Sequence, residues 1–405
     1  MKKWSICLLG TLLLITGCAP DTEEEVVQND EETEQETSIV PSYQLSEENY
    51  KMILPYEPSQ ARGVIVNQVA NRMDIDEMEE GLRRHSKEVY DPSNYFFQEG
   101  QYLDEDTVYD WLGRKLTKSQ LEEAAQKEIN RLEDAEMTVN EEQIRKNLQL
   151  GLNPAIPNDE NKEDHQENPR YLSHILEQNF LTKNEDNTVN LEGISIGLGM
   201  KSVYRYQTET GGPYYYQDIS ENEMMEQATA IAEKVVQRIR NMEGLENVPI
   251  MLAVYREQEQ TSPIPGNYVA KTNIAGGKTS LGDWQNIDEQ YVLFPSDAGK
   301  ENFFEDHELV TSFGNEIAKY FPNYVGVVGE GFYINDELRK LTIEIPIEFY
   351  GKGEVIGFTQ YAYGLVQDMF DNYYDLELKI TSSEKVESTV YREAGADTPT
   401  VHIFH

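Results

Sequence analysis

The chain begins with a short apolar run, from Trp4 to Ile15, that follows Lys2 and Lys3. At about 1.5 Å per residue in a helix, the stretch from Trp4 to Gly17 reaches roughly 21 Å. A bilayer core is about 30 Å thick and needs about 20 apolar residues to be spanned. The run is therefore too short for a permanent membrane span. It is typical of the hydrophobic region of a signal peptide, which we predict over residues 1–17.

The apolar run ends in Ile15-Thr16-Gly17-Cys18, which is similar to the lipobox of bacterial lipoprotein signals. In such signals a peptidase cuts before the cysteine, and the thiol carries a diacylglyceryl group. Two or more acyl chains anchor a protein durably, since each buried CH₂ contributes about 0.8 kcal/mol. We expect cleavage between Gly17 and Cys18, with Cys18 anchored at the outer face of the cell membrane. The alternative is a general secretory signal with an incidental cysteine.

A polar, acidic stretch follows the cysteine. Residues 19–50 contain eleven acidic residues and no basic one, among Thr, Gln, Ser and Asn. Up to about Val40 this stretch has too little apolar surface to fold. We predict residues 18–42 as a disordered tether that lifts the folded part off the lipid. A disordered acidic interaction tail is the alternative.

Helical spacing dominates residues 43–188, which we predict to be a helix-rich α+β region. Three pairs have capping-box spacing: Asp74 with Glu77, Thr117 with Gln120, and Asn140 with Gln143. A further helix is expected after Asn168-Pro169. Its apolar stripe would consist of Leu172, Ile175, Leu176 and Phe180. The segments 50–55 and 63–69 are expected to form a strand pair ahead of these helices.

The pattern changes at about Asn190, so residues 189–405 are predicted to form a C-terminal α+β domain. A strand at 193–206 precedes a helix capped by Ser220 and Glu223, and strands at 248–255 and 267–272 follow. A helix at 303–321 then precedes strands at 324–332 and 341–349. A last helix at 356–370 precedes strands at 376–380 and 400–404. Helix–strand–strand thus recurs three times, which favours an antiparallel or mixed sheet with helices on one face.

Composition excludes some partners. The chain has 405 residues with 34 basic and 74 acidic side chains, and its formal net charge is −40. Removal of Lys2 and Lys3 with the leader makes the mature chain still more acidic. Affinity for nucleic acid comes from clustered Lys and Arg, so nucleic acid is not an expected partner. The only cysteines are Cys7 and Cys18, so the folded part is expected to lack disulfides.

Candidate catalytic and metal motifs are weak. Ala275-Gly-Gly-Lys-Thr-Ser280 resembles the end of a phosphate-binding loop, but Thr272 stands where the first glycine should be and no amphipathic helix follows. The six histidines show no H-E-x-x-H pairing, and the acidic clusters at 74–77 and 184–192 lack EF-hand spacing. No G-x-S-x-G elbow is present. We therefore predict no catalytic residue, cofactor or metal site.

One surface feature is a candidate for binding. Gly211-Gly-Pro-Tyr-Tyr-Tyr216 is an aromatic loop just ahead of a helix. Tyr214, Tyr215 and Tyr216 could stack on sugar rings or hold a peptide. The alternative is that they cap the core and bind nothing.

Several segments of the chain resemble those of the CamS-type sex pheromone lipoproteins of Gram-positive bacteria. The resemblance rests on the lipobox with its acidic tether, on Gly151-Leu-Asn-Pro154, on the segment from Asn168 to Phe180, and on Gly193 to Gly197 continuing into Ser202-Val-Tyr204. It implies a precursor with two products, a short peptide pheromone from the end of the leader and a surface lipoprotein. By position, the peptide would consist of Thr11, Leu12, Leu13, Leu14, Ile15, Thr16 and Gly17. It lacks the aromatic residue of the family's well-known peptide and ends in Thr-Gly.

These observations predict a lipid-anchored α+β lipoprotein whose mature part is a non-enzymatic binding module for an envelope or peptide ligand. Its oligomeric state stays open. The alternative is a cell-envelope hydrolase or carbohydrate-binding enzyme with a site between the two regions. An exposed cleft where carboxylates converge with Tyr214 to Tyr216 would favour the enzyme, and a closed sheet without a polar pocket would favour the binding module.

Overall fold

The computed structural model describes residues 25–28, 37–40, 49–184, 189–321, 324–348, 351–383 and 385–404. About 33% of the chain is helical and 29% is in strands, which confirms the predicted α+β class. Within the predicted tether, β1 (Glu25–Gln28) and β2 (Thr37–Val40) pair in antiparallel fashion, whereas disorder was expected there. Both segments contain β-branched residues, which favour strands.

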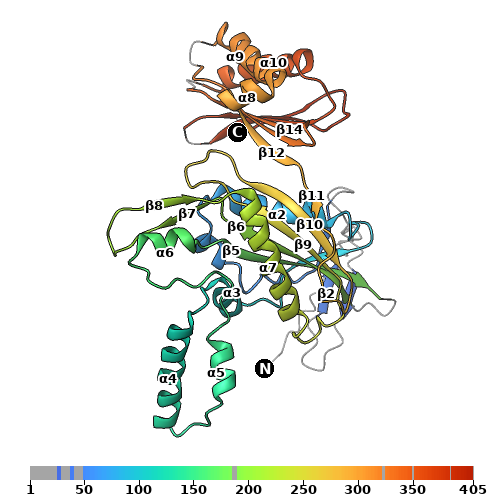
Figure 1. The fold of residues 1–405 in the computed structure, drawn as a ribbon. Coiled ribbons are helices and arrows are strands. Elements are labelled where there is room, and N and C mark those ends of the chain that lie inside the picture. The colour runs from blue at the N-terminus through green and yellow to red at the C-terminus, as the bar shows by residue number, and fades with distance from the viewer. Residues whose placement is uncertain are drawn as a thin grey trace, which may run out of the picture.

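The first sheet has seven strands in the order β11-β10-β9-β6-β5-β4-β3. The pairs β3/β4 and β6/β9 are parallel, and the other neighbours are antiparallel. Its strands are β3 (Lys51–Met52), β4 (Phe96–Glu99), β5 (Leu172–Lys183), β6 (Val189–Met200), β9 (Ile250–Arg256), β10 (Asn267–Ile274) and β11 (Gln285–Asn286). The long pair β5–β6 forms the centre of this unit (Figure 1).

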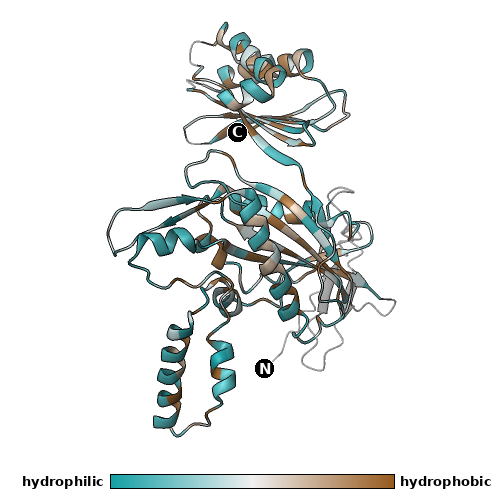
Figure 2. Ribbon diagram, viewed as in Figure 1, coloured by the Kyte–Doolittle hydropathy of each residue, from teal (hydrophilic) through white to brown (hydrophobic). Residues whose placement is uncertain are grey.

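Helices cover both faces of the first sheet. Helix α7 (Glu221–Ile239) packs on one face and α2 (Met73–Ser86) on the other. Strand β9 shows the consequence: Ile250, Leu252 and Val254 belong to the core beneath α7, and Met251, Ala253 and Tyr255 to the core beneath α2. Figure 2 accordingly shows the central strands of this sheet as hydrophobic. Three short helices flank the sheet, α1 (Val64–Gln68), α3 (Glu105–Leu112) and α6 (Lys162–Glu167).

Helices α4 (Lys118–Asp134) and α5 (Glu141–Asn147) form a hairpin that projects from the body (Figure 1). Their own small core consists of Ala125, Ile129 and Ile144. The capping box of Thr117 and Gln120 is confirmed at the start of α4, and the Asn140 side chain caps α5. Ser220 likewise caps α7.

The second sheet has six strands in the order β12-β13-β14-β15-β16-β17, of which β14/β15 are parallel. Its strands are β12 (Glu289–Phe294), β13 (Val328–Ile334), β14 (Glu337–Pro346), β15 (Asp375–Thr381), β16 (Val386–Arg392) and β17 (Thr400–Ile403). Its helices are α8 (Asp297–Asn302), α9 (Phe304–Ala318) and α10 (Lys352–Met369). The expected helix–strand–strand order is confirmed for α7 and α9, each of which precedes an antiparallel strand pair. After α10, β15 pairs with β16, a strand that was not predicted, and the predicted C-terminal strand β17 pairs with β16 instead.

Three local predictions are wrong. Residues 172–183 form strand β5 rather than a helix, because β4 and β6 pair with it on either side. Residues 64–68 form helix α1 rather than a strand. Asp74 lies inside α2 and caps nothing; its carboxylate instead accepts hydrogen bonds from the Tyr255 hydroxyl and from the backbone N–H groups of Gln258 and Gly266.

The chain crosses from the first sheet to the second between Asn286 and Glu289. The boundary that we predicted at 188/189 falls instead between β5 and β6, which are neighbours in one sheet. The change of pattern at Asn190 marks the start of β6, a strand buried from Gly193 onwards, rather than the start of a separate core.

Candidate functional site

A groove of about 810 Å³ lies beside the hairpin of β7 (Val203–Tyr206) and β8 (Tyr215–Asp218). This volume is within the range of about 300–1,000 Å³ that is usual for small-molecule sites. We call it the β7 groove, because all four residues of β7 line it. The end of α1 with the two residues after it, the segment before α6, His165 of α6 and the loop before β5 complete its walls.

The charge of the β7 groove contrasts with that of the chain. Four cationic side chains and three carboxylates line it, in a protein whose formal net charge is −40. The cationic residues are Arg114, Arg170, Lys201 and Arg205, and the acidic ones are Asp159, Glu160 and Glu209. The groove therefore carries a small excess of positive charge, +1 from four cations and three carboxylates, on a strongly acidic molecule.

Arg114 is the most firmly held of these cations. Its Nη1 donates to the carbonyl oxygens of Pro154 and Asn168, at 2.9 Å each, and its Nη2 donates to the Tyr204 hydroxyl at 2.9 Å. The guanidinium also lies over the Tyr204 ring, 5.6 Å from its centroid. These partners are uncharged oxygens, so they do not offset the positive charge of the Arg114 guanidinium as a carboxylate would.

The segments around Arg114 are those on which the family resemblance rests. Pro154 ends Gly151-Leu-Asn-Pro154, Asn168 begins the segment that leads into β5, and Tyr204 ends Ser202-Val-Tyr204. Asn153 fixes two of them, since its buried amide bonds the backbone of Leu112, Tyr171 and Leu172. Three stretches that are far apart in sequence thus meet at one guanidinium.

Aromatic rings form a stacked series along one wall. His165 stacks on Tyr206 with a centroid distance of 4.4 Å, Tyr206 stacks on Tyr204 at 5.2 Å, and Tyr215 lies 5.6 Å from Tyr206. The Nε2 of His165 contacts the Asp159 carbonyl at 2.8 Å and so must donate, and in the neutral ring Nδ1 then accepts from the Tyr204 hydroxyl, also at 2.8 Å. These contacts hold the wall in one conformation.

The predicted aromatic loop lies next to this wall. Tyr215 packs against the core and carries the ammonium of Lys162 at 4.5 Å from its ring. Tyr214 and Tyr216 are 52% and 61% exposed, and the Arg205 guanidinium lies 4.4 Å from the Tyr214 ring. Tyr215 therefore supports the fold, whereas Tyr214 and Tyr216 face solvent near the groove. A binding role for these three tyrosines stays a prediction.

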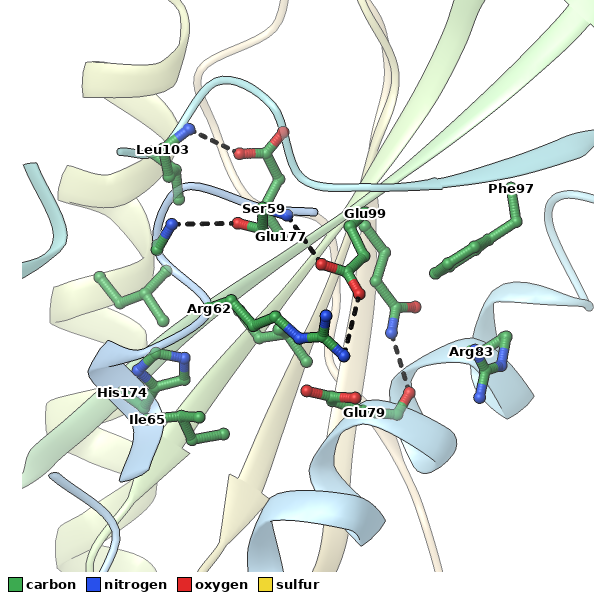
Figure 3. A pocket seen from close by; sticks show the side chains of 14 residues that line it. Ser59, Arg62, Ile65, Glu79, Arg83, Phe97, Glu99, Leu103, His174 and Glu177 are labelled. Carbon is green, nitrogen blue, oxygen red and sulfur yellow. Dashed lines mark hydrogen bonds and ion pairs between the residues drawn. The ribbon is translucent and has the colours of Figure 1, made fainter. Parts of the chain in front are cut away.

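A second, smaller pocket lies between β4, β5, α2 and the segment that ends at Arg62 (Figure 3). Its volume of about 50 Å³ is far below that of a usual small-molecule site. Glu99 accepts from the Ser59 N–H and pairs with Arg62, and Glu177 accepts from the N–H groups of residues 101–103. Burial raises the pKa of Glu79. The carboxylates Glu99 and Glu177 mainly fasten chain segments together.

Other candidates from the sequence have structural roles or lie elsewhere. Residues 275–278 form a turn after β10, with Gly277 at a φ of +72°. Burial raises the pKa of Asp74 to about 7. Its carboxylate already accepts three hydrogen bonds from other groups of the protein, which gives it a structural role. Within the described ranges, no group of three or more His, Cys, Asp and Glu is placed to hold a metal ion. Cys18 and the segment from Thr11 to Gly17 lie outside the described residues.

Sequence reasoning missed the cations of the β7 groove. Tyr204 and Tyr206 could have been suspected, because they alternate along a strand close to Tyr214–Tyr216. Arg114 follows α3 and Arg170 precedes β5, so no local spacing connects them. Only the tertiary fold brings these two arginines into one groove.

Comparisons with known proteins point in one direction. The family model described as CamS sex pheromone cAM373 precursor matches residues 56–398. The chain is similar to the crystal structure of a sex pheromone precursor from Lactobacillus salivarius subsp. salivarius UCC118, with 28% identity, a TM-score of 0.77, and coverage of 91% of this chain and 99% of the other. It is also similar to the C-terminal domain of the sex pheromone staph-cAM373 precursor from Staphylococcus aureus, with 29% identity, a TM-score of 0.68, and coverage of 84% and 99%. No curated protein sequence matches significantly.

Proposed function

This chain belongs to the CamS sex pheromone cAM373 precursor family, and we propose that it is a precursor with two products. One is a peptide released from the end of the leader. The other is a mature domain that is anchored at the outer face of the membrane through Cys18 and binds a ligand without chemical conversion. The match of the family model to residues 56–398 confirms the family resemblance that we drew from sequence.

The lipobox supports the anchor. Ile15-Thr16-Gly17-Cys18 places small residues before the thiol, and the leader is too short to span a bilayer by itself. No helix within the described residues is both long enough and apolar enough to cross a membrane. The acidic stretch after Cys18 would repel an anionic lipid surface and so keep the folded part away from it.

The observation that carries the binding role is the pre-arranged set of donors in the β7 groove. Arg114 is held by three oxygen atoms, and the stacked rings of His165, Tyr206 and Tyr204 fix the wall beside it. Side chains that are already ordered lose little entropy when a ligand binds, which favours affinity. The groove also exceeds the small pocket in volume by more than tenfold.

Replacement of Cys18 by Ala tests the anchor. Cells that express wild type and Cys18→Ala would be labelled with radioactive palmitate and separated into membrane and soluble fractions. The wild type should carry label and sediment with membranes. The variant should carry no label and appear in the medium, because the lipid contributes the membrane affinity.

Cys7→Ala is the matched control, since Cys7 lies in the leader and is removed with it. This variant should behave as wild type. Undiminished membrane retention of Cys18→Ala, with no labelled lipid on either form, would disprove lipid anchoring.

A synthetic peptide tests the first product. The peptide Thr11-Leu-Leu-Leu-Ile-Thr-Gly17 should induce mating transfer in a responder strain at low concentration, and the same residues in reversed order should not. A peptide that induces no responder strain would show that this leader does not supply a pheromone, and it would leave the anchor untouched.

A further inference from the structure

We propose that the β7 groove binds an oxyanion, phosphate or carboxylate, carried on a larger molecule, with Arg170 and the Tyr206 hydroxyl as its main donors. This inference rests on the binding role proposed above and names the chemistry of the ligand.

Arg170 is the first observation. It lines the groove between the loop before β5 and the strand itself, and among the described residues its guanidinium makes no hydrogen bond or ion pair. Burial lowers the pKa of Arg170, and the charge of the neighbouring Arg114 lowers it further. A half-buried guanidinium without a partner, placed beside a second one, is unfavourable in the free protein. An anion bound between the two would remove this penalty.

Tyr206 is the second, independent observation. Its side chain is only 4% exposed, and its hydroxyl is buried without a hydrogen-bond partner among the described residues. A buried hydroxyl with no partner destabilises the free protein, because the loss of its hydrogen bond to water is not compensated. Because the Tyr206 side chain also lines the groove, a small shift of its neighbours would let its O–H donate to an oxygen atom that enters there. Stacking against His165 and Tyr204 keeps the ring at this wall.

The other cations frame the same space. Arg114 uses its two terminal nitrogens for uncharged protein oxygens, and Lys201 donates to the Gln68 carbonyl at 3.3 Å and pairs with Glu257 at 3.4 Å. Arg205 pairs with Gln260 and the Tyr214 ring. Among the described cations that line the groove, Arg170 is therefore the one with all its donors available. Its planar fork matches the two oxygens of a carboxylate or phosphate.

The size of the groove indicates that the oxyanion is one part of a larger ligand. A single phosphate or carboxylate would fill a small fraction of about 810 Å³. The remainder of the ligand would lie along the backbone of residues 67–70 and towards residues 207–210. Residues 67–70 carry no charge and residues 207–210 carry one carboxylate, Glu209, so these stretches suit a hydrogen-bonding body without further negative charge.

Binding of simple probes tests the proposal. The mature chain, residues 18–405 with Cys18→Ser for solubility, would be titrated with inorganic phosphate, dimethyl phosphate, acetate and glycerol at constant ionic strength, and followed by NMR. We expect saturable binding of at least one anion and none of glycerol. Tighter binding of the phosphates would identify a phosphoryl ligand, and tighter binding of acetate a carboxylate; either result supports the proposal.

Two variants locate the site. Arg170→Gln should weaken binding by about tenfold or more, since it removes a charged fork. Tyr206→Phe should weaken it by about threefold or more, because it removes one hydroxyl and keeps the stacked ring. Arg339→Gln is the matched control, because Arg339 lies on β14 of the second sheet and pairs, among the described residues, with the exposed Glu337. It should change binding less than about twofold, since its charge is screened.

Thermal unfolding without probes separates misfolding from loss of the site. Arg170→Gln should melt at the wild-type temperature or above it, because the variant loses repulsion from Arg114 and no protein contact. Absence of saturable anion binding to the folded wild type, or equal effects of Arg170→Gln and Arg339→Gln, would overturn the proposal. Saturable binding of glycerol alone would also overturn it and would leave the binding role intact. The lipid anchor is tested independently at Cys18.

Discussion

His174 links folding to pH through one buried side chain. It lies in β5 with 2% of its surface exposed, and burial lowers its pKa from the ordinary 6.5 to about 3. The unfolded chain takes up a proton on this imidazole near pH 6.5, whereas the folded protein excludes that proton. The stability that neutral His174 contributes is therefore fully present above pH 6.5 and is lost as the pH falls towards 3.

Replacement of His174 by Gln should make stability less sensitive to acid. Between pH 7.5 and pH 5.5 the wild type should lose about 1 kcal/mol more of its free energy of unfolding than His174→Gln does, since one such group contributes at most about 1.4 kcal/mol per pH unit. Urea unfolding at both pH values measures this difference. His402→Gln, on the exposed strand β17, should keep the pH dependence of the wild type. If His174→Gln kept it as well, His174 would not be the titrating group.

Sequence reasoning succeeded for residues whose partners are local. Thr117 and Gln120 could be paired from spacing alone, because a capping box forms within one helical turn. Asp74 has the same spacing to Glu77, yet its partners are Tyr255, Gln258 and Gly266. Nothing near Asp74 in sequence distinguishes the two cases. The donors of the β7 groove were missed for the same reason, since Arg114 and Arg170 meet only in the tertiary fold.

At the scale of one element, strand β5 has a spacing of apolar residues that is typical of a helix. The spacing of Leu172, Ile175, Leu176 and Phe180 fits a helical stripe. In the structure, Leu172 and Ile175 pack in the core beneath α7, and Phe180 packs in the core beneath α2 with Leu176 against it. An irregularity in register between Leu172 and His174 accounts for the odd spacing of the first two. Burial on both faces and a bulge together removed the alternation by which strands are predicted.

The repeated helix–strand–strand order was predictable because each of those elements has one dominant face. In β14, Leu341, Ile343 and Ile345 are fully buried while their neighbours are more exposed. Helix α7 likewise buries a single stripe that includes Met224, Ala228 and Ile231. Which sheet each repeat joins was not predictable, because α7–β9–β10 completes the first sheet and the later two repeats build the second. That choice depends on pairing partners far away in sequence.

At the scale of the whole molecule, Arg84 joins the two sheets. Figure 1 shows the unit built on the second sheet above the unit built on the first. It extends from α2, which covers the first sheet, and its guanidinium contacts Glu77 at 2.7 Å and Glu289 of β12 at 3.0 Å. It also lies 4.5 Å from the ring of Phe332 in β13. Burial alone would raise the pKa of Glu289, but the hydrogen bond from His85 and the charge of Arg84 lower it. The junction thus holds a buried carboxylate that depends on Arg84.

Replacement of Arg84 by Ala should uncouple the two sheets. It leaves Glu289, whose side chain is 1% exposed, without its guanidinium partner, and removal of one partner from a buried pair costs about 3–5 kcal/mol. The only tryptophans of the mature sequence, Trp111 and Trp284, lie before the second sheet. Tryptophan fluorescence therefore follows the first unit, whereas circular dichroism follows both. In urea, wild-type curves from tryptophan fluorescence and from far-ultraviolet circular dichroism should coincide. In Arg84→Ala the dichroism should begin to fall at a lower urea concentration than the fluorescence, as the second sheet unfolds first.

Arg131→Ala is the matched control for Arg84→Ala. Arg131 pairs with Glu128 on the surface of α4 and is 63% exposed, so its loss should change the urea midpoint little and leave the two curves coincident. Both variants remove one positive charge from a chain of net charge −40, so general repulsion changes equally in the two. If Arg84→Ala resembled Arg131→Ala, other contacts between the units would hold the sheets together, such as the contact of β12 with β10 and the hydrogen bond from the Tyr291 hydroxyl to Glu77.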